Sequence, residues 1–333
     1  MTMERRRLGL SDLEITSVGV GTAPIGSLLG IWWVNWGPQD EGEAVRAIRT
    51  ALDVGVNWID TAPFYGWGRA EEIVGRAIRG RDDVLVFTKC GTMRREDGSD
   101  YMDLRPEAIR ADVEGSLRRL GLERLDLLQI HDADPRVPIE ETWGALLELV
   151  AEGMVRHGGI SNHSPELVDR ALAVGPVAAL QHQYSLLARD VEDEILPFAL
   201  RRGLGVIVWA PLAMGFLTDA HKTQELPEGD FRRTHRFAAL ELDCVRVALR
   251  GANRSAAQSA IAWTVSHPAV TGAIVGVRNE REAAELAGAA ALRLTPHERA
   301  TFASSAPSKT SSRSPTRSAH PTRSTRRHPH RRS

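Results

Sequence analysis

Side chains that take part in proton transfer lie at the ends of three consecutive apolar segments. Residues Val56–Asp60 end in an acid, residues Val84–Lys89 in a lysine and residues Leu125–His131 in a histidine. Tyr65 follows the first of these segments by five residues. Segments rich in Val, Leu and Ile are typical of buried strands. The carboxyl ends of neighbouring parallel strands meet, so the four side chains are expected to form one site.

This set of residues predicts proton donation to a carbonyl oxygen. Lys89 at the end of an apolar strand needs a counter-ion, and Asp60 is placed to supply it. A lysine ammonium favours the phenolate of a neighbouring tyrosine, so we expect a lowered pKa for Tyr65. Such a tyrosine donates a proton as the oxygen gains charge, while His131 holds that oxygen. The set contains no hydride source, so reduction requires a cofactor.

Each of the four residues also has an ordinary structural explanation when taken alone. Asp60 fits a loop cap, Tyr65 fits local packing and His131 fits a buried structural histidine. Lys89 is the least usual, because lysine is rarely buried in a strand. The functional interpretation therefore depends on their coincidence at equivalent ends of consecutive strands.

Short apolar segments alternate with stretches of helical periodicity along most of the chain. Strands that alternate with helices imply parallel pairing, and eight such units predict an α/β protein, a (β/α)8 TIM barrel. A short hairpin is expected first, over residues 7–16. The expected strands are Ser17–Gly21, Val56–Asp60, Val84–Lys89, Leu125–His131, Val155–Ser161, Ala178–Gln181, Val206–Trp209 and Val270–Val275. The expected helices are Glu41–Asp53, Ala70–Arg79, Pro106–Leu120, Ile139–Glu152, Pro165–Val174, Asp190–Arg201, Arg254–Ser266 and Glu280–Ala290.

An open doubly wound sheet is the competing architecture. That fold places a GxGxxG motif after its first strand. Here the segment reads Gly19-Val20-Gly21-Thr22-Ala23-Pro24, with proline in place of the third glycine. We therefore favour the barrel.

Composition divides the chain into an acidic body and a basic tail. The whole chain has a formal charge of −1, but residues 307–333 hold eight basic and no acidic residues, which leaves −9 on residues 1–306. We expect a barrel domain over 1–306 and a disordered low-complexity tail over 307–333. An acidic body argues against phosphate-backbone binding, so no nucleic-acid partner is expected.

Further features of the composition exclude other classes of protein. Two cysteines are too few for a disulfide framework or a four-Cys zinc site, and no HxH pair follows a strand, so no metal is expected. The sequence has neither a long apolar stretch nor a signal peptide, which predicts a cytoplasmic protein without a membrane partner. The oligomeric state stays open.

Several motifs, in order between residues 7 and 290, resemble the signatures of the aldo-keto reductases. The resemblance implies NADPH-dependent reduction of a small aldehyde or ketone in a (β/α)8 barrel without metal. It implies that Tyr65 is the general acid, that Lys89 and Asp60 tune it and that His131 orients the substrate. The motifs are Asp60-Thr61-Ala62-Pro63-Phe64-Tyr65-Gly66, Thr88-Lys89, Leu128-Gln129-Ile130-His131, Gly158-Gly159-Ile160-Ser161-Asn162, Gln181-His182-Gln183-Tyr184-Ser185-Leu186-Leu187 and Trp209-Ala210-Pro211-Leu212.

The same resemblance implies a set of cofactor-binding residues. Ser161, Asn162 and Gln181 would bind the nicotinamide carboxamide, because amides supply both donors and acceptors. Trp209 would stack on the nicotinamide ring, and Arg278 fits a 2′-phosphate at the adenosine end. The remaining implied contacts are Thr22, Asp60, Ala210, Pro211, Leu212, Gly215, Arg232, Gly276, Glu282 and Glu285.

Two departures from the family pattern stand out. Glu282 lies where relatives often have Gln, and a carboxylate at the adenosine end disfavours a second negative charge. Both NADPH and NADH therefore remain possible cofactors. His182 lies where relatives often have Asn, which affects packing behind the nicotinamide.

Aromatic residues near the predicted site suggest an apolar mouth for aromatic or extended carbonyl substrates. They are Trp32, Trp33, Phe64 and Trp67. Packing of the loops themselves, or against a partner subunit, explains these rings equally well. The alternative to an enzyme is a cofactor-sensing binding module resembling the potassium-channel β subunits, which keep the same four residues.

Overall fold

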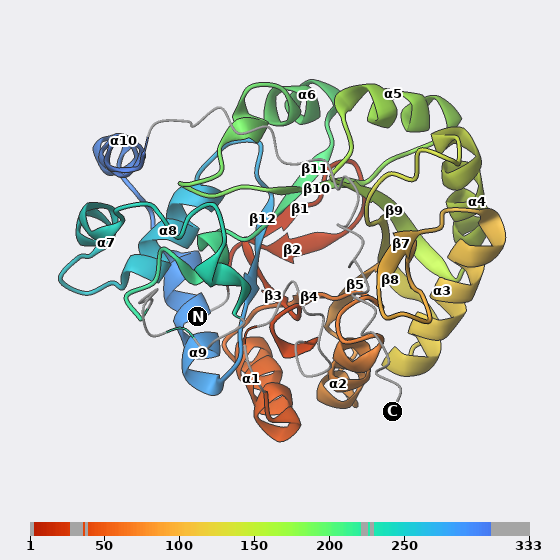
Figure 1. The fold of residues 1–333 in the computed structure, drawn as a ribbon, viewed down its shortest axis with the longest axis horizontal. Helices are drawn as coiled ribbons and strands as arrows, with labels where there is room; N and C mark the ends of the chain where they lie inside the picture. Colours follow the sequence, from red (N-terminus) through yellow and green to blue (C-terminus); the bar gives the residue numbers. More distant parts are fainter. Residues whose placement is uncertain (1–2, 27–35, 37–38, 221–225, 227–229, 308–333) are drawn as a thin grey trace, which may run out of the picture.

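The chain forms a closed barrel of eight parallel strands surrounded by helices (Figure 1). The computed structural model describes residues 3–26, 36, 39–220, 226 and 230–307. Around the barrel the strands follow the order β10-β11-β12-β3-β4-β5-β8-β9, so the predicted (β/α)8 architecture is confirmed. The barrel strands are β3 (Val18–Gly21), β4 (Trp58–Asp60), β5 (Leu85–Cys90), β8 (Leu125–Ile130), β9 (Val155–Ser161), β10 (Ala179–Gln183), β11 (Gly205–Trp209) and β12 (Gly272–Gly276).

Several helices begin where the sequence places helix-starting residues. Pro106 and Pro165 occupy the first turns of α3 and α5, as predicted, and the side chain of Ser164 accepts a hydrogen bond from the backbone N–H of Leu167. No helix within the described ranges is long and apolar enough to cross a membrane. The helices are α1 (Glu41–Asp53), α2 (Arg69–Ile78), α3 (Pro106–Leu120), α4 (Ile139–Ala151), α5 (Pro165–Val174), α6 (Ile195–Arg202), α7 (Asp243–Leu249), α8 (Ala256–Val265), α9 (Glu280–Ala291) and α10 (Pro296–Ser305).

Three further elements, two hairpins and helix α7, are added to the barrel. The predicted N-terminal hairpin is present as β1 (Arg5–Arg7) paired with β2 (Glu14–Thr16). A second hairpin, β6 (Thr92–Arg94) with β7 (Asp100–Met102), and helix α7 are absent from the sequence prediction. Helices α7 and α10 lie side by side at the outer edge (Figure 1). The predicted basic tail lies outside the described residues from position 308 onward.

The barrel interior is layered, because alternate residues of a strand point to the same side. Four strands carry an apolar residue and, two positions later, a polar one. The apolar members belong to one buried cluster with side chains of the N-terminal hairpin, and the polar members form the next layer toward the carboxyl ends. The pairs are Trp58 and Asp60, Phe87 and Lys89, Leu127 and Gln129, and Ala179 and Gln181.

Trp58 fixes the apolar layer below the polar one. Its ring packs 5.3 Å from that of Phe87, and its indole N–H donates to the carbonyl of Thr16 at 2.8 Å. Gly19 makes room for this ring, since a Cβ there would lie 2.2 Å from the indole. The dry layer beneath Asp60 and Lys89 therefore keeps both side chains directed toward the barrel mouth.

Candidate active site

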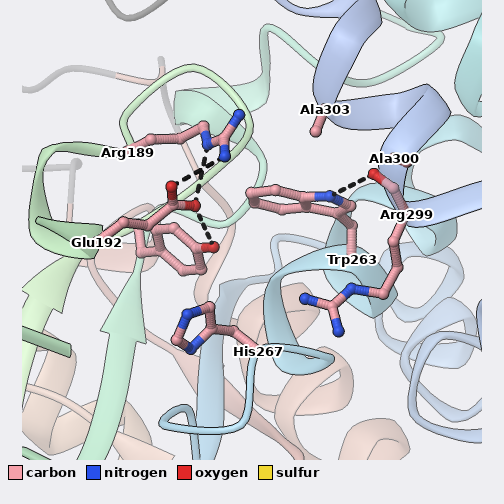
Figure 2. Close-up of a pocket in the computed structure, with 8 residues that line it drawn as sticks. Arg189, Glu192, Trp263, His267, Arg299, Ala300 and Ala303 are labelled. Atoms are coloured by element: carbon pink, nitrogen blue, oxygen red, sulfur yellow. Dashed lines mark hydrogen bonds and ion pairs between the residues drawn. The ribbon is translucent and has the colours of Figure 1, made fainter. Parts of the chain in front are cut away.

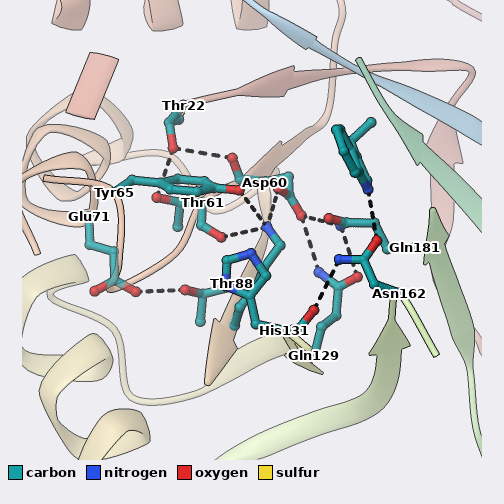
Figure 3. A network of polar contacts seen from close by, with 12 residues as sticks. Thr22, Asp60, Thr61, Tyr65, Glu71, Thr88, Gln129, His131, Asn162 and Gln181 are labelled. Carbon is teal, nitrogen blue, oxygen red and sulfur yellow. Dashed lines mark hydrogen bonds and ion pairs between the residues drawn. The ribbon is translucent and has the colours of Figure 1, made fainter. Parts of the chain in front are cut away.

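Lys89 contacts three residues of the polar network in the barrel mouth, Asp60, Thr61 and Tyr65, which Figure 3 labels. Its Nζ donates to Asp60 Oδ1 at 2.5 Å and to the carbonyl of Thr61 at 3.0 Å, and lies 3.3 Å from the hydroxyl of Tyr65. The side chains of Lys89 and Asp60 are 0% and 2% exposed. A buried ammonium is tolerated only with a close counter-ion and further acceptors, which these contacts supply.

The second carboxylate oxygen of Asp60 is held by two amides. Gln129 Nε2 donates to Oδ2 at 3.1 Å and Gln181 Nε2 donates to it at 2.8 Å. The same Gln181 amide donates to Gln129 Oε1 at 3.0 Å. Gln129 was not predicted as a site residue, although a polar residue inside the apolar segment of β8 is a usable signal.

The pKa of Tyr65 corrects the prediction from sequence. Burial in the mouth raises the pKa of the phenol, and the charge of Lys89 lowers it by less than burial raises it. The predicted lowering is therefore wrong. Burial is the largest single effect on Lys89 and opposes its charge, but the contributions of Asp60 and Tyr65 together outweigh burial, and the lysine pKa is raised. At neutral pH the site accordingly holds a protonated phenol beside an ammonium.

His131 follows β8 directly and lies beside Tyr65. Their ring centroids are 6.1 Å apart at an interplanar angle of 83°. The Nδ1 atom of His131 lies 3.3 Å from the hydroxyl of Thr92 on β6, and Asn162 Nδ2 donates to the His131 carbonyl at 3.2 Å. The unpredicted β6–β7 hairpin therefore orients the imidazole.

One of the four predicted mouth aromatics, Phe64, lies against this histidine, and a second, Trp67, packs against Phe64. Phe64 packs edge-on against His131, with ring centroids 6.0 Å apart, and against Trp67 at 5.1 Å. Phe64 is buried, so it supports the wall next to the imidazole. Trp32 and Trp33 lie outside the described residues.

The residues expected to bind nicotinamide lie together at or near the carboxyl ends of β9, β10 and β11. Trp209 donates from Nε1 to Asn162 Oδ1 at 3.2 Å, and the Asn162 backbone N–H donates to the Gln181 carbonyl at 3.0 Å. Ser161 Oγ is buried and has no hydrogen-bond partner among the described residues. A buried hydroxyl left without a partner fits a polar ligand group such as a carboxamide.

Strained backbone surrounds the same mouth. Among the described residues, positive φ outside glycine occurs at Trp67, Asn162, Ala210, Ala213 and Met214, in loops that follow β4, β9 and β11. Each such residue costs about 1–3 kcal/mol and is typical of functional sites. Backbone conformations that lower stability are therefore concentrated in the loops around the mouth, as is typical of a functional site.

Other predicted cofactor contacts lie along these loops. Thr22 Oγ1 donates to Thr61 Oγ1 at 2.8 Å, next to the lysine site. The guanidinium of Arg232 forms two hydrogen bonds with Asp230, at 3.0 and 2.6 Å, and lies next to Gly215. The structure thus brings Arg232 and Gly215 together, with the arginine already paired to a carboxylate.

The last predicted contacts lie after β12. Arg278 and Glu282 form an ion pair at 2.9 Å. Glu285, one turn further along α9, instead accepts a hydrogen bond from the hydroxyl of Ser255 at 3.1 Å. The predicted adenosine region is therefore assembled at the beginning of α9, while Glu285 is directed toward α8.

A second pocket, of about 440 Å³, lies outside the barrel between α8, α10 and the segment after β10 (Figure 2). Its Glu192 accepts hydrogen bonds from the hydroxyl of Tyr184 at 2.8 Å and from the Nε of Arg189 at 2.9 Å. Trp263 Nε1 donates to the Arg299 carbonyl at 3.2 Å. The polar groups of this pocket form hydrogen bonds with one another, so the barrel mouth is the better candidate for a reactive site.

Comparison with known proteins shows which family this chain resembles over most of its length. Residues 25–306 match the model of the aldo/keto reductase family. An aldo-keto reductase of Bacillus subtilis, YhdN, is 34% identical over 291 residues, which cover 83% of this chain and 85% of that protein.

Solved structures agree with this match. A glycerol dehydrogenase from Gluconobacter oxydans superposes with a TM-score of 0.82 at 32% identity, over 92% of this chain and 95% of that one. An aldo/keto reductase from Klebsiella pneumoniae, in complex with NADP and acetate, gives a TM-score of 0.69 at 29% identity, over 90% and 94%. The chain therefore belongs to the aldo/keto reductase family, a family of oxidoreductases that use nicotinamide cofactors.

Proposed function

We propose that this chain reduces aldehydes or ketones to alcohols, with Tyr65 as the proton donor. The observation that carries the proposal is the buried Lys89, which contacts the Asp60 carboxylate and the Tyr65 hydroxyl at once. A nicotinamide dinucleotide, when bound, supplies the hydride. The proposed substrate is a small carbonyl compound, and the proposed working unit is the barrel over residues 1–306.

In this mechanism the phenol is the only group that gives up a proton. Burial raises the pKa of Tyr65, so the phenol is protonated before reaction. When the carbonyl oxygen gains negative charge, Tyr65 transfers its proton to it and becomes a phenolate. The ammonium of Lys89 stabilises that phenolate, and Asp60 keeps the ammonium in place. His131, held by Thr92, is positioned to orient the carbonyl oxygen.

The chain offers a continuous set of residues to hold the cofactor. We assign the carboxamide to Ser161, Asn162 and Gln181, on the strength of the unpartnered Ser161 hydroxyl, and the nicotinamide ring to Trp209. Thr22, Ala210, Pro211, Leu212, Gly215 and Arg232 would follow the rest of the cofactor from the mouth, and Gly276, Arg278, Glu282 and Glu285 its far end.

A cofactor-sensing binding module is the alternative function. It requires the same four residues and therefore the same geometry at Lys89. The relatives found by comparison are reductases and a dehydrogenase, which does not favour this alternative.

The substitution Tyr65→Phe tests the proposal. Loss of general acid catalysis typically costs about a hundredfold to ten-thousandfold in rate, so kcat for a test aldehyde should fall by that range. The Kd for NADPH, measured by protein fluorescence, should stay near the wild-type value. Tyr101→Phe on the β6–β7 hairpin is the matched control and should leave kcat unchanged. Undiminished aldehyde reduction by the Tyr65 variant would show that the proton donor is misassigned.

A further inference from the structure

We infer that Glu282 sets which nicotinamide dinucleotide this chain binds, and that it favours the one without a 2′-phosphate. The inference rests on the proposed function, because it concerns the cofactor of the same site. It also revises what Arg278 predicts when taken alone, namely a preference for NADPH.

Arg278 is held firmly at the end of the eighth barrel strand. Gln39 Nε2 donates to the Arg278 carbonyl at 2.7 Å. At Gly276 a Cβ would lie 2.7 Å from the ring of Pro24, so the backbone packs closely against the segment after β3. In (β/α)8 barrels, the loops after the last two strands and a helix N-terminus often form a phosphate site. Arg278 therefore lies where a phosphate group of a ligand is expected.

Glu282 already uses the donors that such a phosphate needs. Its Oε1 accepts from the guanidinium of Arg278 at 2.9 Å, and its Oε2 accepts from the backbone N–H of Arg278 at 2.9 Å. The side chain of Asn279 accepts from the Glu282 N–H at 2.9 Å and caps α9. A backbone N–H beside a helix N-terminus, combined with a guanidinium, is a typical phosphate-binding set. In this chain the carboxylate of Glu282 occupies that set.

Dinucleotides with and without a 2′-phosphate are expected to interact differently with the Arg278–Glu282 pair. A 2′-phosphate has to displace the carboxylate from Arg278 and then lies beside a like charge, which is unfavourable. A ribose 2′-hydroxyl donates to a carboxylate instead, as in sites that select NAD. The side chains of Arg278 and Glu282 are 41% and 27% exposed, so a ligand can reach both. Glu282 should therefore favour the ligand with the free hydroxyl.

The test compares two fragments that lack nicotinamide, ADP-ribose and 2′-phospho-ADP-ribose, by isothermal titration calorimetry. The wild type should bind ADP-ribose at least as tightly as the phosphorylated fragment. Glu282→Gln removes the charge but keeps an oxygen for the Arg278 N–H. Since a hydrogen bond to a charged group is worth about 1.5–3 kcal/mol, this variant should bind the phosphorylated fragment roughly tenfold to a hundredfold tighter. Glu152→Gln, which breaks an exposed carboxylate–guanidinium pair with Arg110 away from the mouth, is the matched control and should leave the ratio of the two Kd values unchanged.

The outcomes separate this inference from the proposed function. A wild type that binds the phosphorylated fragment tenfold more tightly, or a Glu282→Gln variant with an unchanged ratio, overturns the role of Glu282 but leaves a dinucleotide site. Absence of binding by both fragments overturns the dinucleotide site itself, and the inference with it. Thermal melting of each variant establishes that a change in Kd does not reflect unfolding.

Discussion

Two cation–carboxylate pairs in this molecule, Lys89–Asp60 and Arg278–Glu282, use similar charges in different surroundings. The first pair is inside the barrel, with both side chains almost fully buried and the carboxylate also held by two glutamine amides. The second pair joins the loop after β12 to the first turn of α9, with both side chains partly exposed. A buried pair cannot exchange partners without leaving a charge unpaired, whereas an exposed pair can. The buried pair is therefore suited to positioning a reactive group, and the partly exposed pair is suited to selecting a ligand.

The largest expected effect comes from breaking the buried pair. Lys89→Met leaves the Asp60 carboxylate buried without its cation, which should cost about 3–5 kcal/mol of unfolding free energy and abolish turnover. Urea denaturation measures the first effect and aldehyde reduction the second. The double variant Asp60→Asn/Lys89→Met removes both charges and should recover part of the stability but none of the activity.

An exposed pair provides the control for that experiment. Arg170 and Glu140 interact at 2.7 Å on the helical surface, where an ion pair is worth at most about 1 kcal/mol. Arg170→Ala should therefore change stability by no more than that amount. A loss in Lys89→Met no larger than the loss in Arg170→Ala would contradict the distinction between the two environments.

A smaller effect is expected from a buried group that lacks a charged partner. Burial lowers the pKa of His182 from 6.5 to about 4, with a contribution from neighbouring His163. The unfolded chain then binds a proton as the pH falls below 6.5 while the folded chain does not, so stability is present above that pH and is lost on acidification. Between pH 7.5 and 5 this histidine should account for about 2 kcal/mol.

Denaturation of His182→Asn across that pH range measures the contribution. The variant should lose about 2 kcal/mol less than the wild type on acidification, whatever its stability at neutral pH. His297→Asn, at an exposed position on α10, is the control and should follow the wild type. Parallel curves for the wild type and the His182 variant would show that this histidine is not held neutral by burial.

The smallest effect is expected from the basic tail. We propose that residues 307–333 contribute nothing to the site, because the residues assembled in the mouth all precede them. Deletion of 307–333 should leave kcat and KM for a test aldehyde within about twofold of the wild type, a change of under 0.5 kcal/mol. A larger loss of reductase activity would place part of the working unit in the tail.

Much of the fold follows from the pattern of side chains along the chain. Apolar segments alternating with helical periodicity predict all eight barrel strands, and proline at the first helical turn predicts where α3 and α5 begin. The hairpin β6–β7 and helix α7 were not predicted. Both are short and interrupt a longer connection, so neither extends over enough residues to show a clear period.

The candidate site was predicted as a set of residue types at strand ends. Asp60, Lys89 and His131 are recognisable because charged or polar residues end apolar segments. Gln129 and Thr92 were missed, since their roles come from contacts with residues far away in the chain: Gln129 with Asp60, and Thr92 with His131.

The barrel, the family resemblance and the four side chains at the mouth follow from strand alternation and residue type, which are local properties of the chain. The raised pKa of Tyr65 depends on the folded structure, since burial outweighs the charge of Lys89 there. The pairing of Arg278 also depends on the fold: the sequence indicates a residue that fits a 2′-phosphate, and in the structure its guanidinium and backbone N–H both contact Glu282. Burial and pairing depend on which groups meet in space, and the order of residues along the chain does not contain that information.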